Sequence, residues 1–419
     1  MPEAHTAVSR HGAARFACTG RPERVAAPGP PGEGPRGWRS VHVIARSKSP
    51  DVLVVGAGVV GCAVARHLAL RGARVRVLER GEPGAESSWA AAGLLAPLVG
   101  ADEPGPFVDL LLRGREVYPA FAAALREETG IDLGYSDAGT LSLALTDADE
   151  PAMERRHAWQ SAAGLPVERL TAEEARRLEP GINPELRWAL RFPGDHQVDN
   201  RGLARALCVA AKRAGADVRA GAAVDRLAWS GGRLAGVELA DGERVEADAV
   251  VLAAGCWAGR LLGLPRALPV LPVHGQIAAV AVVPQRFRHC VDTARCYLVP
   301  RADGRLIAGA TAERGVWRKA VTPAGLCSVL AGATEIAPWI GDLPLVETWS
   351  GLRPGTPDDL PVLGPDPAVP NLFYATGHYR NGILLGPLTG EVVGEMVMGG
   401  DAGFDVGPFG IGRFENGLG

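Results

Sequence analysis

Three glycines and one glutamate within residues 51–80 have the types and spacing needed to bind a dinucleotide. The run DVLVVGAGVVG places Gly56, Gly58 and Gly61 in the order G-x-G-x-x-G. In this motif the first glycine permits a tight turn, the second lets a pyrophosphate approach the backbone, and the third lets the following helix pack closely on the sheet. Glu79 follows about twenty residues later, where a carboxylate can accept hydrogen bonds from the ribose hydroxyls of an adenosine. The four residues therefore predict a dinucleotide site.

A strand, a helix and a second strand are needed to position these four residues. Residues 52–55 form the aliphatic run of a buried strand, and residues 59–71 have the pattern of a helix with one charged face that ends at Gly72. The N-terminus of that helix would present free N–H groups to the phosphates. A glycine-rich turn can also be only a means of packing a strand against a helix. Glu79 at the end of the second strand favours the cofactor interpretation.

The loop after Glu79 continues directly from this unit. It reads RGEPGAESSWAAAGLLAP and is rich in small and hydroxyl-bearing residues. Ser87 and Ser88 can donate hydrogen bonds to phosphate or ribose oxygens, and the small residues 90–93 leave the backbone accessible to a large planar ligand. A helix N-terminus capped by serine would explain the same residues equally well.

Length and composition exclude several classes of protein. The chain has 419 residues, of which 47% are hydrophobic, and this is enough to bury the cores of two domains. The formal net charge of −3 lacks the excess of positive charge that is typical of nucleic-acid-binding proteins. No apolar run approaches the roughly eighteen residues that cross a bilayer, so we expect no membrane span.

The cysteines and histidines indicate a reducing compartment and no metal site. Seven cysteines are scattered and never form C-x-x-C, and nine histidines show no clustered ligand spacing. We therefore expect buried thiols, no protein-bound metal and a cytoplasmic protein.

The order of the predicted elements indicates two domains. Residues 1–49 are rich in Pro, Gly, Arg and Ala without an apolar period, which predicts a disordered extension. A parallel-sheet pattern then gives way to mixed helices and strands, and the run DAVVLAAG at 248–255 indicates a return to the first domain. We predict an α/β, Rossmann-like cofactor domain and an α+β substrate domain built on an antiparallel sheet. The predicted boundaries are 50–98, 196–265 and 342–402 for the cofactor domain, 99–195 and 266–341 for the substrate domain, and 403–419 for a tail.

Local signals predict individual helices. Apolar periodicity indicates helices over 107–128 and 322–337. Thr171 and Glu174 have the spacing of a capping box, and Asn200 is the predicted cap of the helix that follows it.

Three stretches of the sequence together resemble the D-amino-acid oxidase family of flavoproteins, and within it the glycine oxidases of thiamine biosynthesis. These stretches are VVGAGVVG with the loop that follows Glu79, CYLVPRADGRLIAGAT, and SGLRPGTPDDLPVLG with ATGHYRNGILLGP. The similarity runs in the family's order over residues 50–400. It implies FAD as the cofactor, a cofactor domain like that of glutathione reductase, and a homo-oligomer. No cysteine follows Cys327, so the C-terminal motifs offer no thiol for covalent attachment and we expect noncovalent FAD.

The resemblance also implies the residues of the site. For the substrate it implies Arg353 on the carboxylate, Tyr297 as the hydroxyl partner of Arg353, Arg380 at the flavin end of the pocket, and Leu94 in the pocket wall. The implied FAD contacts are Gly56, Gly58, Val59, Val60, Gly61, Glu79 and Arg80 on the ADP half, Ser87, Ser88, Ala92, Gly93 and Leu94 along the ribityl chain and flavin, Val224 at the adenine, and His378, Tyr379, Arg380, Asn381, Gly382, Ile383 and Leu384 at the pyrimidine edge.

Two positions depart from the family's pattern. Leu94 stands where the loop usually reads AAAGM, a change that nearly conserves volume. The triplet His274-Gly275-Gln276 replaces the frequent R-G-Q, so a cation carried over to position 274 would depend on the protonation of a histidine.

The chemistry implied by the resemblance is oxidation of glycine, and of sarcosine or small D-amino acids, to an imino acid. A hydride moves from Cα to flavin N5, and oxygen becomes hydrogen peroxide. Arginine suits the clamp because its planar fork holds a carboxylate at two points. Arg353 could instead pair on the surface with Asp358 or Asp359, and Tyr297 could be only a core aromatic. Two functional alternatives remain: a dehydrogenase that reduces a quinone or carrier protein, and a noncatalytic FAD-binding module.

Overall fold

The computed structural model describes residues 50–414. The predicted disordered extension, residues 1–49, lies outside the described residues, as do the last residues of the predicted tail, 415–419. Two large sheets form the framework of the described part of the chain, and each packs on its own hydrophobic core.

The first sheet has six strands, and β1 (Val52–Val55) lies in its middle. β1 pairs in parallel with β2 (Val75–Leu78) on one side and with β12 (Ala249–Leu252) on the other. All four side chains of β1 are buried, because helices cover one face of the sheet and a second layer covers the other. The predicted α/β fold class is confirmed. The remaining strands are β8 (Asp217–Arg219) beside β2, β20 (Leu372–Thr376) beside β12, and β19 (Val362–Pro365) antiparallel at the edge.

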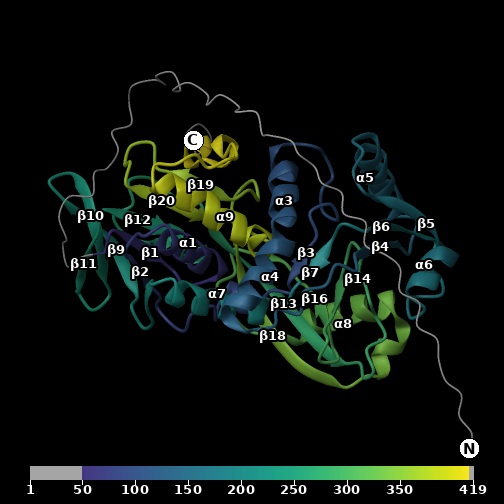
Figure 1. The fold of residues 1–419 in the computed structure, drawn as a ribbon. Coiled ribbons are helices and arrows are strands. Elements are labelled where there is room, and N and C mark those ends of the chain that lie inside the picture. Colours follow the sequence, from purple (N-terminus) through teal and green to yellow (C-terminus); the bar gives the residue numbers. More distant parts are fainter. Residues whose placement is uncertain (1–49, 415–419) are drawn as a thin grey trace, which may run out of the picture. The chain divides into compact units, whose positions relative to one another are not determined.

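Three helices cover one face of this sheet. They are α1 (Val59–Leu70), α7 (Asn200–Arg213) and α9 (Gly382–Val397), and α1 packs against both of the others. Figure 1 shows α1 in purple directly beside α9 in yellow, although the two helices come from opposite ends of the described chain.

A row of glycines explains the close contact between α1 and α9. Gly386, Gly390 and Gly394 repeat every fourth residue and therefore lie on one face of α9. A Cβ atom on Gly390 would lie 2.7 Å from the carbonyl carbon of Ala63 in α1. Cβ atoms on the other two glycines would meet Val59 and His67. The row thus lets the two backbones approach more closely than side chains would permit.

The opposite face of the first sheet carries a three-stranded antiparallel layer. Its strands are β9 (Val224–Ser230), β10 (Arg233–Leu239) and β11 (Arg244–Glu246). Apolar side chains of this layer share a core with β1 and β12.

The second sheet has nine strands and is antiparallel except where β14 pairs with β4. Helix α8 (Pro323–Ile336) covers one of its faces. The other face packs against the loop around Ala90 and Ala92. Its strands are β4 (Thr140–Ala144), β5 (Glu168–Thr171), β6 (Trp188–Phe192), β13 (Leu271–Ala281), β14 (Cys290–Asp292), β15 (Tyr297–Pro300), β16 (Arg305–Gly309), β17 (Glu313–Arg314) and β18 (Leu345–Gly355).

The other elements connect these layers. Two short strands, β3 (Leu94–Leu95) and β7 (His196–Gln197), pair with each other. The remaining α-helices are α2 (Ser87–Ala90), α3 (Pro106–Glu116), α4 (Tyr118–Thr129), α5 (Glu150–Ala162) and α6 (Ala172–Leu178), and the short 3₁₀ helices are Gly255–Arg260, Pro338–Asp342, Gly407–Phe409 and Ile411–Phe414.

Several local predictions can be compared with these elements. The capping box of Thr171 and Glu174 is present at α6, and the helix predicted over 322–337 is α8. The helix predicted over 107–128 is two helices that meet at Val117. The cap predicted at Asn200 is wrong, because the Asp199 side chain accepts from Arg201 N and Asn200 is the first residue of α7.

Three segments pack differently from the predicted domain boundaries. Strand β18 pairs with β13 in the second sheet, whereas the predicted boundary at 342 assigns it to the cofactor domain. Helices α3 and α4 bury Leu111 and Leu125 in the core of the first sheet. Phe409, in the predicted tail, is fully buried in that same core. Apolar side chains on these segments decide their placement, and the sequence pattern alone does not show which core they join.

Candidate cofactor and substrate site

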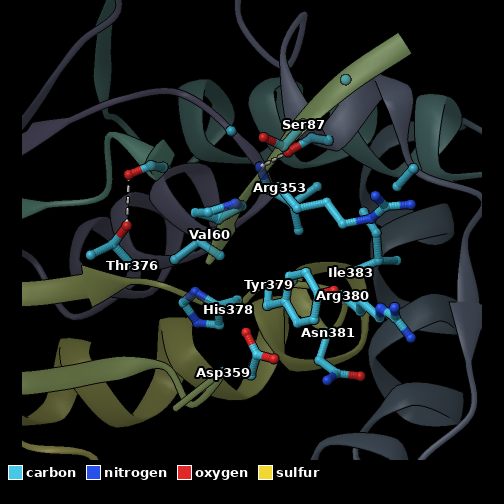
Figure 2. A pocket seen from close by; sticks show the side chains of 18 of the residues that line it. Val60, Ser87, Arg353, Asp359, Thr376, His378, Tyr379, Arg380, Asn381 and Ile383 are labelled. Carbon is cyan, nitrogen blue, oxygen red and sulfur yellow. Dashed lines mark hydrogen bonds between the residues drawn. The ribbon is translucent and has the colours of Figure 1, made fainter. Parts of the chain in front are cut away.

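A cavity of about 1020 Å³ lies between the two sheets. This volume is at the upper end of the range of about 300–1,000 Å³ found for ligand pockets. Its walls come from the turn between β1 and α1, the loop around α2, strands of the second sheet and the turn before α9. In Figure 2 the labelled stretch from His378 to Asn381 lies across the pocket from Ser87 and Arg353.

The glycine-rich turn has the geometry that its motif requires. Gly56 has φ of +102°, and a Cβ atom there would lie 2.6 Å from the carbonyl oxygen of Ala253 in the chain after β12. Gly58 is the N-cap of α1, and a Cβ atom there would lie 3.1 Å from Ser88 Oγ. Gly61 lies against the carbonyl of Gly56 and does not line the cavity. The N-terminus of α1 is thus open toward the cavity with no side chain at Gly58.

The Glu79 carboxylate is held at this same end of the cavity. It is buried at the end of β2, where one oxygen accepts from Ala57 N at 2.8 Å and the other from Gly81 N at 2.9 Å. Each carboxylate oxygen has a second lone pair, so the group can still accept a ligand hydroxyl.

The two serines of the α2 loop both bond to the protein. Ser88 Oγ accepts from Val59 N at 3.0 Å, at the start of α1. Ser87 Oγ donates to the Leu352 carbonyl at 2.5 Å and so ties the loop to β18. Neither serine caps α2, whose N-cap is Glu86 without a side-chain bond. Both serines line the cavity.

Arg301 supports the loop from behind, and the sequence analysis missed it. Its guanidinium is buried, donates to the Ala92 carbonyl at 2.7 Å and to Asn200 Oδ1 at 3.0 Å, and lies below Gly93. Asn200 in turn donates to the carbonyls of Ser88 and Trp89. Burial lowers the pKa of Arg301 from its usual value. The only sequence signal was an arginine directly after the buried strand YLVP.

Trp257 is a second cavity residue that the sequence analysis missed. The Arg80 guanidinium lies over its ring at 3.4 Å, and Trp317 packs against it with ring centroids 5.9 Å apart. Arg80 also pairs with Glu86 at 2.5 Å, and Glu86 pairs with Lys319 at 2.8 Å. This network links the loop after β2 to the segment around Trp317.

The turn before α9 forms another wall. His378 is buried and hydrogen-bonds to Thr389 at 2.9 Å, and burial lowers the pKa of His378 to about 4, so its ring is neutral at pH 7. Tyr379 has φ of +48°, a strained conformation for a non-glycine residue, which is common at functional sites. Arg380 is exposed, with its guanidinium 5.0 Å from the ring of Tyr379. Asn381 is the N-cap of α9.

Arg353 and Tyr297 lie on a floor made of two glycines of the second sheet. The Arg353 guanidinium lies over Gly275 in β13, and the Tyr297 hydroxyl lies over Gly309 in β16. Arg353 Nη1 donates to the Thr311 carbonyl at 3.1 Å. Burial raises the pKa of Tyr297, while hydrogen bonding and the charge of Arg353 act in the opposite direction. The two side chains are therefore neighbours and both face the cavity.

The alternative of a surface ion pair for Arg353 is wrong. Asp359 bonds to Arg314 and Asp358 bonds to Arg413. Arg353 instead places its fork over Gly275, where the cavity begins.

Most of the other residues that the sequence predicted for the site line this cavity, and two do not. Val59, Val60, Arg80, Ala92, Leu94, Val224, Gly382 and Ile383 are lining residues. Gly61 and Leu384 lie behind the lining, and Leu384 is buried in the core with α1. His274 is also outside the lining, fully buried, with Nδ1 3.1 Å from Glu313.

The thiols near the cavity are buried and add no reactive group to it. Cys296 lines the cavity and Cys256 lies near it, and burial raises the pKa of each to about 12. Between residues 50 and 414 no cluster of three or more His, Cys, Asp or Glu side chains is arranged to hold a metal ion. Over the same range no helix is long and apolar enough to cross a membrane.

A mostly parallel sheet with a glycine-rich turn, joined by a second sheet that closes the cavity, defines a dinucleotide-binding protein. The family model described as FAD dependent oxidoreductase matches residues 51–396. The chain belongs to this family.

Individual relatives agree with this assignment. The glycine oxidase of Geobacillus kaustophilus is 39% identical over 87% of this chain and 97% of its own length. Its crystal structure has a TM-score of 0.84 to this fold, with 38% identity over 88% of this chain and 99% of that chain. The bifunctional protein ThiO/ThiG of Synechocystis is 38% identical over 83% of this chain, which spans 51% of that longer protein.

The residues present fit FAD. The cavity runs from Val224, beside the first sheet, to Tyr297 in the second. Gly58 leaves space at the N-terminus of α1 for a pyrophosphate, and Glu79 stands where the ribose of an adenosine would lie. The small residues from Ala90 to Gly93 form a wall without large side chains, against which a planar ring can lie.

Proposed function

We propose that the chain is an FAD-dependent oxidase of small amino acids, with glycine as its main substrate and sarcosine and small D-amino acids as further ones. The observation that carries the proposal is the placement of Arg353 beside Tyr297 on the glycine floor, opposite the turn from His378 to Asn381. Similarity to glycine oxidases over nearly the whole of their length supports it.

Arg353 would hold the substrate carboxylate. Its guanidinium has one donor on the Thr311 carbonyl and others that face the cavity, so it can bind a carboxylate at two points. Tyr297 would donate its hydroxyl proton to the same carboxylate, and burial favours the protonated hydroxyl. Arg380, which is exposed at the rim, would add positive charge near the flavin end.

FAD, when bound, supplies the hydride acceptor for the Cα–H bond. The protein then has to orient Cα and keep water away from it. Arg353 and Tyr297 fix one end of a small substrate, and the walls from the α2 loop and the α9 turn enclose the rest. The substrate amine must be in its neutral form to release electrons toward the acceptor.

The proposed products are an imino acid, which hydrolyses to glyoxylate and ammonia in the case of glycine, and hydrogen peroxide from oxygen. Imino-acid production would supply the thiazole branch of thiamine synthesis. We further propose noncovalent FAD, a cytoplasmic location and a homo-oligomer. The division into a cofactor domain and a substrate domain also stays a proposal, with β18 assigned to the second.

Anaerobic mixing with glycine tests the proposal. The flavin absorbance of the purified yellow protein should bleach, and air should then restore it with formation of hydrogen peroxide in a coupled peroxidase assay. Bleaching without peroxide, together with reduction of a dye, would favour a dehydrogenase that uses a quinone or a carrier protein. A flavin that stays oxidised with every small amino acid and amine tried would favour a noncatalytic FAD-binding module.

A further inference from the structure

One carboxyl group of the cavity differs from the others in its surroundings. Six acidic residues line the cavity: Glu79, Glu86, Asp102, Glu103, Asp292 and Asp359. Glu79 bonds to backbone N–H groups, while Glu86, Asp102 and Asp359 each form an ion pair with a lysine or arginine. Glu103 is exposed at the rim. Asp292 is the one that is largely enclosed and has no ion pair among the described residues.

The sheet register fixes the direction of the Asp292 side chain. Asp292 ends β14 and lies directly opposite Tyr297 in β15, so the two side chains share one face of the sheet. Cys290, two residues earlier in β14, belongs to the apolar cluster with Ala90 and Ala92 on the cavity face. Side chains alternate along a strand, so Asp292 projects to the same face as Cys290.

Asp292 and Arg353 lie at opposite ends of the Tyr297 side chain. The ring of Tyr297 leans over Gly309, its neighbour on the β16 side, and its hydroxyl reaches Arg353 there. Asp292 is the neighbour of Tyr297 on the other side, in β14. A substrate long enough to pass Tyr297 can therefore place its carboxylate at Arg353 and a distal group at Asp292.

The charged groups around Asp292 do not neutralise it. Burial raises the pKa of Asp292 to about 7, and the positive charges of Arg156 and Arg380 and a hydrogen bond from Ser142 only partly offset this effect. The Arg156 guanidinium in α5 bonds to Asp102 at 2.7 Å, and Arg380 is exposed. On the other elements packed around it, burial raises the pKa of the Asp195 carboxyl, of the Cys296 thiol to about 12, and of the Tyr297 hydroxyl.

We propose that Asp292 binds a protonated nitrogen of the substrate at the end of the cavity away from Arg353. This inference rests on the proposed function. A carboxylate enclosed in a cavity without a fixed cation attracts a bound cation more strongly than an exposed one does, because little water screens it. The nitrogen is a second ammonium group on a longer side chain, because the α-amine must be neutral for oxidation and is only two bonds from the carboxylate carbon that Arg353 would hold.

The variant Asp292→Asn, assayed as the holoenzyme, tests the proposal with three substrates. Glycine has one nitrogen, D-norvaline adds a three-carbon side chain, and D-ornithine adds the same side chain with an ammonium group. Loss of the charge-assisted hydrogen bond should lower kcat/KM for D-ornithine at least about tenfold and leave glycine and D-norvaline unchanged. An equal fall for all three substrates would show that Asp292 acts on the groups they share and would overturn the proposal.

The pH profile gives a second, independent readout. Protonation of Asp292 removes its charge, so kcat/KM of the wild type for D-ornithine should fall as the pH drops through about 7, and glycine should not show this limb. Asp292→Asn is neutral throughout and should lack this limb. The limb from the substrate's own amine, at higher pH, should remain in both proteins.

Controls separate this inference from other causes. Asp109→Asn, on the exposed face of α3, removes a carboxylate from the surface and should leave all three substrates and the pH profile unchanged. Acetate carries no nitrogen, so its inhibition constant should be the same in the wild type and in Asp292→Asn. Loss of flavin or a lower Tm in Asp292→Asn would show that the carboxyl serves the cofactor or the fold and would overturn the proposal.

An unchanged kcat/KM for every substrate in an Asp292→Asn variant that binds flavin normally would also overturn it. Such a result leaves the proposed function intact, because the wild type would still oxidise glycine. A wild type that oxidises no amino acid would instead contradict the proposed function itself.

Discussion

The guanidinium of Arg353 lies over Gly275, and a Cβ atom on the glycine would be 2.7 Å from Cζ. The two residues belong to neighbouring strands, β18 and β13, and their contact crosses the sheet. Gly275 therefore sets the height of the guanidinium above the sheet and hence the position of anything the guanidinium holds.

The variant Gly275→Ala should displace Arg353 without removing its charge. Misplacing a reacting group by about 1 Å can cost roughly a hundredfold in rate, so we expect kcat/KM for glycine to fall between about tenfold and a hundredfold. Steady-state kinetics check this expectation. Gly341→Ala is the control, because a Cβ atom there would make only an ordinary 3.5 Å contact. Equal kinetics for the two variants would show that the floor does not position the clamp.

Arg353→Leu should reduce turnover far more than Tyr297→Phe. Each charge-assisted hydrogen bond contributes about 1.5–3 kcal/mol, so loss of a two-point clamp should lower kcat/KM by about 10²–10⁴-fold. Tyr297→Phe removes only one such bond, at about 1.5–3 kcal/mol, or about 13–160-fold, and leaves the charge of Arg353 in place. Flavin absorbance and Tm should be unchanged in both variants. Small and equal losses with normal glycine saturation would place the substrate carboxylate elsewhere.

Gly58→Val should abolish FAD binding. A Cβ atom at Gly58 would already lie 3.1 Å from Ser88 Oγ, and a branched side chain would fill the space in front of the α1 N-terminus. The ratio of flavin to protein absorbance after purification measures the effect. Retention of stoichiometric flavin would contradict the assigned position of the pyrophosphate.

Gly390→Ala should destabilise the protein although alanine favours helices by about 1 kcal/mol over glycine. The new Cβ atom would lie 2.7 Å from both the carbonyl carbon and Cβ of Ala63, and overpacking of this kind costs about 1–3 kcal/mol. Thermal unfolding should show a lower Tm. Gly382→Ala, in the same helix but with an ordinary 3.6 Å contact to His378, is the stability control. A Tm raised in both variants would rule out a tight α1–α9 contact.

His378 should lower stability in acid. Burial depresses its pKa from an ordinary value near 6.5 to about 4, so the unfolded chain binds the proton first and stability falls as the pH drops below about 6.5. The loss approaches about 3 kcal/mol near pH 4. Comparing the Tm of the wild type and His378→Gln from pH 8 to pH 4.5 tests this, since the wild type should fall more steeply. Parallel curves would contradict a buried neutral ring.

The parts of the site that follow one another in sequence could be predicted. The strand, the turn with Gly56 and Gly58, and Glu79 lie within one short unit whose local pattern fixes their geometry. The face and the partners of Arg353 could not be derived from local pattern, because Gly275 reaches it from β13 and Thr311 from the connection between β16 and β17.

The residues that were missed act across long distances in the chain. Arg301 donates to the carbonyl of Ala92, and the Arg80 guanidinium lies over the ring of Trp257. Neither contact produces a periodic pattern in the sequence. The glycine row of α9 does repeat every fourth residue, but the repeat gains meaning only when Ala63 of α1 is known to face it. The placement of β18 and of Phe409 likewise depends on which apolar surface remains uncovered after the sheets form.

The packing of α9 on α1 also affects the order of events during synthesis. At about 5–20 residues per second, a ribosome makes α1 tens of seconds before it makes α9. Until then the nascent chain has the phosphate turn but lacks β20, the turn around His378 and the helix that packs on Ala63. FAD thus meets its full set of contacts only after α9 has been synthesised, and before then the turn at Gly58 is present without the wall around His378.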